Sequence, residues 1–215
     1  MNRRQTCRSL LALGAAAALA ACQTTPPVAL VPPAGPEKPP RPAPRPPRIG
    51  LALGGGAARG FAHIGVIQVL EEAGNRPDLV VGTSAGSLVA ALYAAGRSGP
   101  ELARTALAMD ESAITDWSFP GRGMIRGDAL ARYVREMTGG RTIEQLPLPL
   151  GIVATDLDSG AAMLFQRGDV GQAVRASSAV PAVFQPVKIG SREYVEAAWC
   201  RRCRCALRAR WGPSW

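Results

Sequence analysis

Residues 78–96, DLVVGTSAGSLVAALYAAG, decide the fold because one sharp turn within them joins two kinds of element. Residues 78–81 form a short apolar run typical of a buried strand, and residues 87–96 are rich in Ala and Leu, as in a helix. Between them lies the GxSxG sequence GTSAG, residues 82–86. In a nucleophile elbow of this form the flanking glycines relieve crowding, and the serine hydroxyl rises above the sheet at a helix N-terminus. The pattern predicts that Ser84 is a nucleophile.

A second glycine turn precedes the first along the chain. Residues 49–53, IGLAL, suit a buried strand, residues 54–60, GGGAARG, form a loop, and residues 61–74 have the spacing of a helix that ends near Gly74. Such a loop offers backbone N–H groups to negative charge at a helix N-terminus. A P-loop would need Gly-Lys-Ser/Thr, and a dinucleotide fingerprint would need a third glycine where Arg59 stands.

The base that activates Ser84 is not expected to be a histidine. The chain has a single histidine, His63, which lies in the first turn of the predicted helix and ahead of the serine. The α/β-hydrolases instead run in the order serine, acid, histidine. We therefore interpret His63 as a structural helix residue and expect an acidic base.

Four motifs together resemble the patatin-like phospholipases, including their bacterial lipoprotein members. The resemblance covers about residues 49–195, and it implies a three-layer α/β/α hydrolase with a mainly parallel central sheet, incomplete at the C-terminus. The motifs are GGGAARG with its continuation GFAHIGVIQVLEEAG (54–74), GTSAG (82–86), ATDLDSG (154–160) and RASSAVPAVFQPV (175–187).

The resemblance also implies a chemistry, namely a serine–aspartate dyad that hydrolyses acyl esters of lipids. Ser84 would attack the acyl carbonyl from an elbow formed with Gly82 and Gly86, and neither a metal nor another cofactor is implied. The oxyanion would be stabilised by the backbone amides of the first loop, set in place with one arginine: Gly54, Gly55, Gly56 and Arg59. Asp156 and Asp158 of ATDLDSG are interpreted as structural or supporting residues.

The dyad acid is where the sequence departs from the family pattern. The family reads Tyr-Val-Asp-Gly-Gly, whereas residues 194–198 read Tyr-Val-Glu-Ala-Ala. Glu196 occupies the position of the missing aspartate with a side chain one methylene longer and without the following glycines. We expect impaired hydrolysis; the alternative is a non-catalytic envelope lipoprotein that keeps the fold to bind lipid or protein.

Residues 196–215 differ in composition from the domain before them. They hold five arginines and the cysteines Cys200, Cys203 and Cys205. Codons compatible with this tail read GGLVSPVPVRAARALGAEL in another frame, so we interpret the segment as a frameshift tail, real or from a sequencing error. A metal site is the competing interpretation, but CxxCxC supplies only three ligands and no histidine is near.

The N-terminus predicts export and lipid anchoring. Residues 1–21 have arginines followed by a short apolar run, as in a signal peptide, and they end in a lipobox whose lipidated residue is Cys22. Residues 22–48 are rich in proline and read as a spacer. Because Gln23 is not the aspartate of inner-membrane retention, we expect the outer membrane, facing the periplasm.

The formal net charge of +9 first suggests a nucleic-acid or membrane-surface binder. Residues 1–48 and 197–215 carry +11 of that charge, which leaves the domain at −2. No nucleic-acid partner is therefore expected, and the predicted partners are a lipid substrate and a membrane. The domain also has no cysteine between Cys22 and Cys200, which excludes a disulfide framework.

The middle of the domain is less distinctive. Residues 128–140 predict an amphipathic helix, and residues 146–157 predict the approach to a strand and the strand itself. Residues 109–124, with Trp117 and Phe119, are either a lid or acyl-facing loop or a loop that covers the core.

Overall fold

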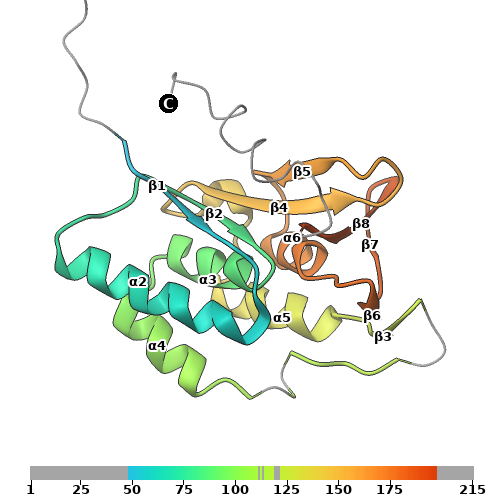
Figure 1. The fold of residues 1–215 in the computed structure, drawn as a ribbon, viewed down its shortest axis with the longest axis horizontal. Helices are drawn as coiled ribbons and strands as arrows, with labels where there is room; N and C mark the ends of the chain where they lie inside the picture. The colour runs from blue at the N-terminus through green and yellow to red at the C-terminus, as the bar shows by residue number, and fades with distance from the viewer. Residues whose placement is uncertain (1–47, 111, 113, 119–121, 198–215) are drawn as a thin grey trace, which may run out of the picture. The chain divides into compact units, whose positions relative to one another are not determined.

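The computed structural model describes residues 48–110, 112, 114–118 and 122–197 (Figure 1). The predicted signal peptide, Cys22, the spacer up to residue 47 and the tail from residue 198 lie outside the described residues. The helices and strands are, in chain order, β1 (Gly50–Leu53), η1 (Ala57–Gly60), α2 (Phe61–Glu72), β2 (Leu79–Thr83), α3 (Ala85–Ala94), α4 (Gly99–Leu107), β3 (Gly123–Ile125), α5 (Asp128–Met137), η3 (Ile143–Gln145), β4 (Leu150–Asp156), β5 (Ala162–Phe165), α6 (Val170–Ser177), β6 (Ala182–Phe184), β7 (Val187–Ile189) and β8 (Arg192–Glu196).

The main sheet is mixed. β1, β2 and β4 pair in parallel, because the connections β1–α2–β2 and β2–α3–α4–α5–β4 cross over through helices. β5, β8 and β7 join as antiparallel strands, since short turns connect β4 to β5 and β7 to β8. The predicted α/β fold is confirmed, and its parallel part is formed by the two glycine-turn strands and β4.

The pairings of β4 show which strands share an edge. β5 pairs with residues 152–155 of β4, β2 with residues 150–153, and β8 with residues 154–156. Because β5 overlaps both other strands, it occupies one edge of β4, and β2 and β8 follow one another along the opposite edge. Thr83 pairs with Val153 and Glu196 with Ala154, so the C-terminal ends of β2 and β8 meet.

The described α-helices lie on one side of the sheet in Figure 1 and share its largest hydrophobic cluster. Val80 and Ile152, both fully buried, project from the sheet into that cluster, where α3 and α6 contact the strands. Val81 and Val153 alternate to the opposite face and contact β5. Packing in this cluster holds α3 in place on the sheet, and with it Ser84, the residue just before the helix.

The predicted elements and the observed ones agree for both strand–turn–helix units, α5 and β4. Gly74 has a φ of 73° just after α2, which is the left-handed conformation expected of a helix-ending glycine. The sequence interpretation did not identify α4 and α6, although Ser98 and Glu101 form a capping box at α4. No helix in the described part of the chain is long and apolar enough to cross a membrane.

Candidate active site

Ser84 occupies the turn between β2 and α3 in a strained conformation. Its φ of 50° and ψ of −126° lie in a region that non-glycine residues rarely adopt and that costs about 1–3 kcal/mol. The neighbouring glycines make room for this turn: a Cβ on Gly82 would lie 2.5 Å from the Gly86 carbonyl oxygen, and a Cβ on Gly86 would lie 2.5 Å from the Gly54 carbonyl oxygen. The backbone makes a sharp strand-to-helix turn with a glycine on each side, which is the geometry expected of a nucleophile elbow.

Two other serines hold the backbone of Ser84 from both sides. The Ser84 N–H donates to the side-chain oxygen of Ser177 at 2.8 Å, and the Ser177 hydroxyl donates to the carbonyl of Val153 at 2.6 Å. The Ser87 hydroxyl donates to the Ser84 carbonyl at 2.6 Å. Ser87 and Ser177 are fully buried. The sequence interpretation assigned neither a role; a serine one turn into the helix after GxSxG was the available signal for Ser87.

The first glycine loop lies against the elbow. A Cβ on Gly55 would be 3.2 Å from the Ser84 Cβ and 3.9 Å from its hydroxyl oxygen, so only a glycine lets the loop come this close without displacement. Within the described residues, the N–H groups of Gly55 and Gly56 donate to no protein acceptor. Arg59 is exposed, and its backbone N–H donates to the Gly56 carbonyl at 3.0 Å, which closes the turn that starts η1. In the part of the chain that the structure describes, two amide donors of this loop therefore have no protein acceptor, and one of them belongs to Gly55, which lies against Ser84.

His63 contacts the same loop rather than Ser84. Its Nε2 lies 2.7 Å from the carbonyl oxygen of Gly54. A carbonyl oxygen only accepts, so Nε2 carries the proton in this bond and has no lone pair to offer Ser84. The arrangement agrees with the prediction that His63 is not the base.

Glu196, the last residue of β8, lies near the end of β2 because both strands pair with the same edge of β4. Its N–H donates to the Ala179 carbonyl at 2.9 Å, and its carbonyl accepts from the Thr155 hydroxyl at 3.1 Å. The carboxylate of Glu196 and the hydroxyl of Ser84, both within the described residues, make no hydrogen bond with each other. Glu196 therefore has a fixed backbone next to the elbow and a half-buried side chain.

Asp156 is fully engaged in holding the β4–β5 turn and β8. Its carboxylate accepts from the hydroxyl and N–H of Ser159 at 2.7 and 2.9 Å and from Arg192 at 2.9 Å. These hydrogen bonds lower the pKa of Asp156 to about 2, and those from Ser159 have the largest effect. Asp158 is exposed in the turn. Both positions agree with a structural or supporting role, as predicted.

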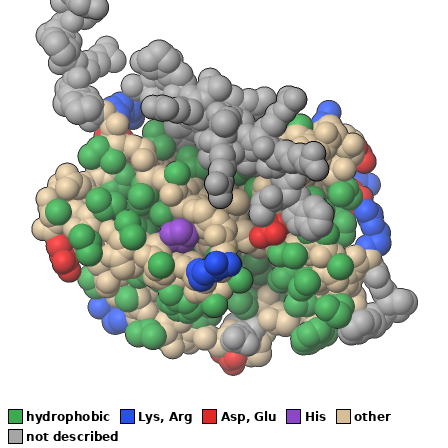
Figure 2. All heavy atoms as spheres, viewed as in Figure 1, with side chains coloured by type: hydrophobic (Ala, Val, Ile, Leu, Met, Phe, Trp, Pro, Cys, Tyr) green, Lys and Arg blue, Asp and Glu red, His purple; other side chains and the backbone are tan. Residues whose placement is uncertain are grey.

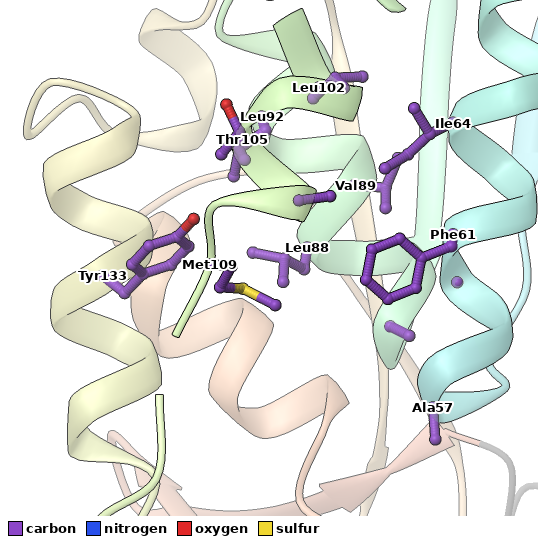
Figure 3. Close-up of a pocket in the computed structure, with 13 residues that line it drawn as sticks. Ala57, Phe61, Ile64, Leu88, Val89, Leu92, Leu102, Thr105, Met109 and Tyr133 are labelled. Atoms are coloured by element: carbon purple, nitrogen blue, oxygen red, sulfur yellow. The ribbon is translucent and has the colours of Figure 1, made fainter. Parts of the chain in front are cut away.

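An apolar pocket opens beside the elbow (Figure 3). Its volume is about 100 Å³, and it runs from Ala57 and Ala85 between α2, α3 and α4 towards Tyr133 on α5. Burial raises the pKa of the Tyr133 phenol. Met109, from the segment predicted as a lid or core-covering loop, also lines the pocket. Residues 111, 113 and 119–121 of that segment lie outside the described residues.

The surface above these helices is partly apolar. Figure 2 shows hydrophobic side chains spread over the face seen in this view, with charged groups of both signs between them. The exposed apolar side chains include Phe61, which also lines the pocket, and Leu107 on α4. No cluster of three or more His, Cys, Asp or Glu side chains in the described ranges is arranged to hold a metal ion.

Residues 51–203 of the chain match the family model described as patatin-like phospholipase. An uncharacterized NTE family protein of Mycobacterium tuberculosis is 43% identical over 149 residues, which are 68% of this chain and 41% of that protein. Human patatin-like phospholipase domain-containing protein 6 is 38% identical over 145 residues, which are 65% of this chain and 10% of that protein. The chain thus spans about two fifths of the mycobacterial relative.

Solved structures share the fold. VipD from Legionella pneumophila superposes with a TM-score of 0.59 at 17% identity, over 71% of this chain and 46% of that one. The type III effector protein ExoU of Pseudomonas aeruginosa gives a TM-score of 0.51 at 21% identity, over 65% of this chain and 40% of that one. At these identities the likeness concerns the arrangement of helices and strands.

Proposed function

We propose, since this chain belongs to the patatin-like phospholipase family, that it hydrolyses acyl esters of lipids with Ser84 as the nucleophile. The observation that carries the proposal is the position of Ser84. It sits in a strained elbow against Gly55 of the glycine loop, and the next residue, Ala85, lines an apolar pocket. These features supply what acyl transfer needs: a serine hydroxyl, donors for an oxyanion and a site for an acyl chain.

The proposed reaction begins with proton transfer from the Ser84 hydroxyl to the Glu196 carboxylate. The serine oxygen forms a bond to the acyl carbon, and the carbonyl electron pair moves to its oxygen, which becomes the oxyanion. When the tetrahedral intermediate collapses, the carbon–oxygen bond to the alcohol breaks, and Glu196 returns the proton to the departing alcohol. Water then releases the acyl group from Ser84 by the same steps, with Glu196 again taking and returning a proton.

The amides of the glycine loop would stabilise the oxyanion. Gly55 and Gly56 donate to no protein acceptor within the described residues, and Gly55 lies against Ser84. Removing one donor from such a site typically costs about 10²–10³ in kcat. The Ser84 amide is engaged by Ser177 and is not counted among these donors.

The pocket supports an acyl chain as the group that is bound. It is lined almost wholly by apolar side chains, among them Leu88, Val89 and Ile64. Its volume of about 100 Å³ is below the ~150 Å³ cavity that holds benzene in a model protein. A pocket of this size suits the first few carbons of an acyl chain, and the remainder would lie along the exposed apolar surface near Phe61.

The experiment is hydrolysis of p-nitrophenyl acyl esters and of phospholipid in vesicles by the purified protein, with Ser84→Ala as control. We expect slow turnover that the substitution abolishes, and labelling of Ser84 by a fluorophosphonate. Turnover that persists in Ser84→Ala would assign the reaction to another residue. Absence of both turnover and labelling would refute the proposal.

A non-catalytic function in lipid or protein binding is the second candidate. Glu196 favours this function. Its side chain is one methylene longer than the aspartate of the family pattern, and within the described residues its carboxylate makes no hydrogen bond with Ser84. A displacement of about 1 Å can reduce a rate about a hundredfold. Vesicle binding without labelling of Ser84 would support this second function over the first.

We further propose that the protein is anchored to the cell envelope through Cys22, with the outer membrane facing the periplasm as its site. The proposal rests on the signal-like residues 1–21 and the lipobox. Metabolic labelling with a radioactive fatty acid should mark the full chain and should be lost in Cys22→Ala. Equal labelling of both proteins would contradict lipidation at this residue.

A further inference from the structure

His63 and Gly54 are joined across the glycine loop. His63 is the third residue of α2, and its Nε2 donates to the carbonyl oxygen of Gly54 at 2.7 Å. This bond links the two ends of the loop, since Gly54 follows β1 directly and His63 lies in the first turn of the helix that follows η1. The imidazole is half-buried, and its Nε2 bonds to the Gly54 carbonyl and not to Ser84 or Glu196.

The bond fixes more than the position of a carbonyl. In a trans peptide unit the C=O of one residue and the N–H of the next point in opposite directions. Holding the Gly54 carbonyl towards His63 therefore directs the Gly55 N–H away from His63. A Cβ on Gly86 would lie 2.5 Å from the Gly54 oxygen, so this carbonyl lies on the side of α3, where His63 and Gly86 enclose it.

Among the described residues, His63 is the one whose side chain donates a hydrogen bond to the Gly54 carbonyl. Gly54, Gly55 and Gly56 have no side chain of their own, and glycine backbones reorient at little steric cost. If the peptide unit between Gly54 and Gly55 rotated, it would present a carbonyl oxygen where an amide is needed. A negative dipole end facing an oxyanion destabilises the transition state instead of stabilising it.

We propose that His63 is a positioning residue that holds the Gly55 amide in the orientation required for the oxyanion hole. The inference rests on the proposed function, because an oxyanion forms only if Ser84 attacks an acyl group. His63 neither binds substrate nor takes the serine proton, since its Nε2–H is engaged by Gly54. The neutral Nε2–H form and the cation can both donate this bond.

The kinetic test compares His63→Phe, which keeps an aromatic ring without a donor, with His63→Gln, which keeps a side-chain N–H. Val69→Ala, at an exposed position of the same helix, is the matched control. We expect His63→Phe to lower kcat, or the rate of fluorophosphonate labelling, roughly ten- to a hundredfold. KM should change less than about twofold, His63→Gln should recover part of the loss, and Val69→Ala should match the unmodified protein. Labelling of His63→Phe at the unmodified rate would overturn the inference.

A second readout does not depend on activity. Because His63 is the only histidine, selective ¹⁵N-histidine labelling gives an NMR spectrum of one imidazole. We expect a single tautomer with a slowly exchanging Nε2–H, and faster amide exchange in residues 54–60 of His63→Phe. If the fluorophosphonate does not label Ser84 in the unmodified protein, that result would count against the proposed function alone. Rapid exchange of the Nε2–H, or unchanged loop exchange in His63→Phe, would count against the role of His63.

Discussion

The side-chain oxygen of Ser177 accepts the backbone N–H of Ser84 at 2.8 Å. In the parallel ladder of β2 and β4, Val80 donates to the Pro149 carbonyl, and the same pattern two rungs later would join the Ser84 N–H to Val153. The Ser177 hydroxyl instead donates to Val153 and stands between the two groups. β2 thus leaves the sheet at Ser84 without an unpaired amide, and α6 supplies the group that separates the strands.

Ser177→Ala should disturb both stability and reactivity. Removing the hydroxyl leaves the buried Ser84 N–H and Val153 carbonyl without their partner, which costs about 1–3 kcal/mol. If the two groups close the gap and bond directly, Ser84 moves with them. We expect a lower free energy of unfolding in urea and at least a tenfold slower labelling of Ser84 by a fluorophosphonate.

Ser178→Ala is the control for this substitution, because Ser178 is the next residue and, among the described residues, the hydrogen bonds to Ser84 and Val153 come from Ser177. It should behave like the unmodified protein in both measurements. Equal effects of the two substitutions would mean that loss of a hydroxyl in this segment, and not the bridge to Ser84, is responsible.

Gly86→Ala and Gly65→Ala should have opposite effects on stability. A Cβ on Gly86 would meet the carbonyl oxygens of Leu53 and Gly54, which are backbone atoms that cannot turn aside, so we expect a loss of about 2 kcal/mol or more. A Cβ on Gly65, inside α2, meets no atom within 4 Å, and alanine should raise the free energy of unfolding by about 0.5–1 kcal/mol. Urea denaturation of both variants tests the pair; destabilisation of both would show that α2 tolerates no added side chain at Gly65.

Asp156→Asn should reduce stability in a pH-dependent manner. The pKa of Asp156 is about 2 in the folded protein, below its ordinary value of 3.8, so the unfolded chain binds this proton more readily. The stabilisation is therefore present above about pH 4 and is lost as the pH falls towards 2. The difference in Tm between the unmodified protein and Asp156→Asn should be largest near pH 6 and shrink below pH 4. Asp158→Asn, at an exposed position, should have nearly the same Tm as the unmodified protein. If the Tm difference between the unmodified protein and Asp156→Asn stays constant with pH, the lowered pKa of Asp156 is not its cause.

The two glycine turns were predictable because each has a local cause. The apolar runs, the glycines and the helical spacing all lie within about twenty residues of Ser84 or of Gly54. The hydrogen bond between Ser177 and Ser84 and the proximity of Glu196 to the end of β2 join residues about a hundred positions apart. Both depend on the order of strands along β4. The spacing of apolar residues along the sequence does not indicate the order of the strands in the sheet, so the sequence analysis missed the role of Ser177. The proximity of Glu196 was inferred from family resemblance alone.

Glu196→Asp should increase the rate of ester hydrolysis. The end of β8 meets the end of β2, and the backbone of Glu196 is held by Ala179 and Thr155, so the substitution shortens the side chain without moving its attachment. In Glu196→Asp the carboxylate is therefore closer to the backbone by the length of one methylene group. Since about 1 Å of misplacement can cost about a hundredfold, a gain of about tenfold or more is expected in kcat for p-nitrophenyl esters. Glu196→Gln, which keeps the length but cannot take a proton, should abolish turnover. If Glu196→Gln and the unmodified protein hydrolyse at the same rate, Glu196 is not the base; if aspartate lowers the rate, the longer carboxylate is the one that this elbow requires.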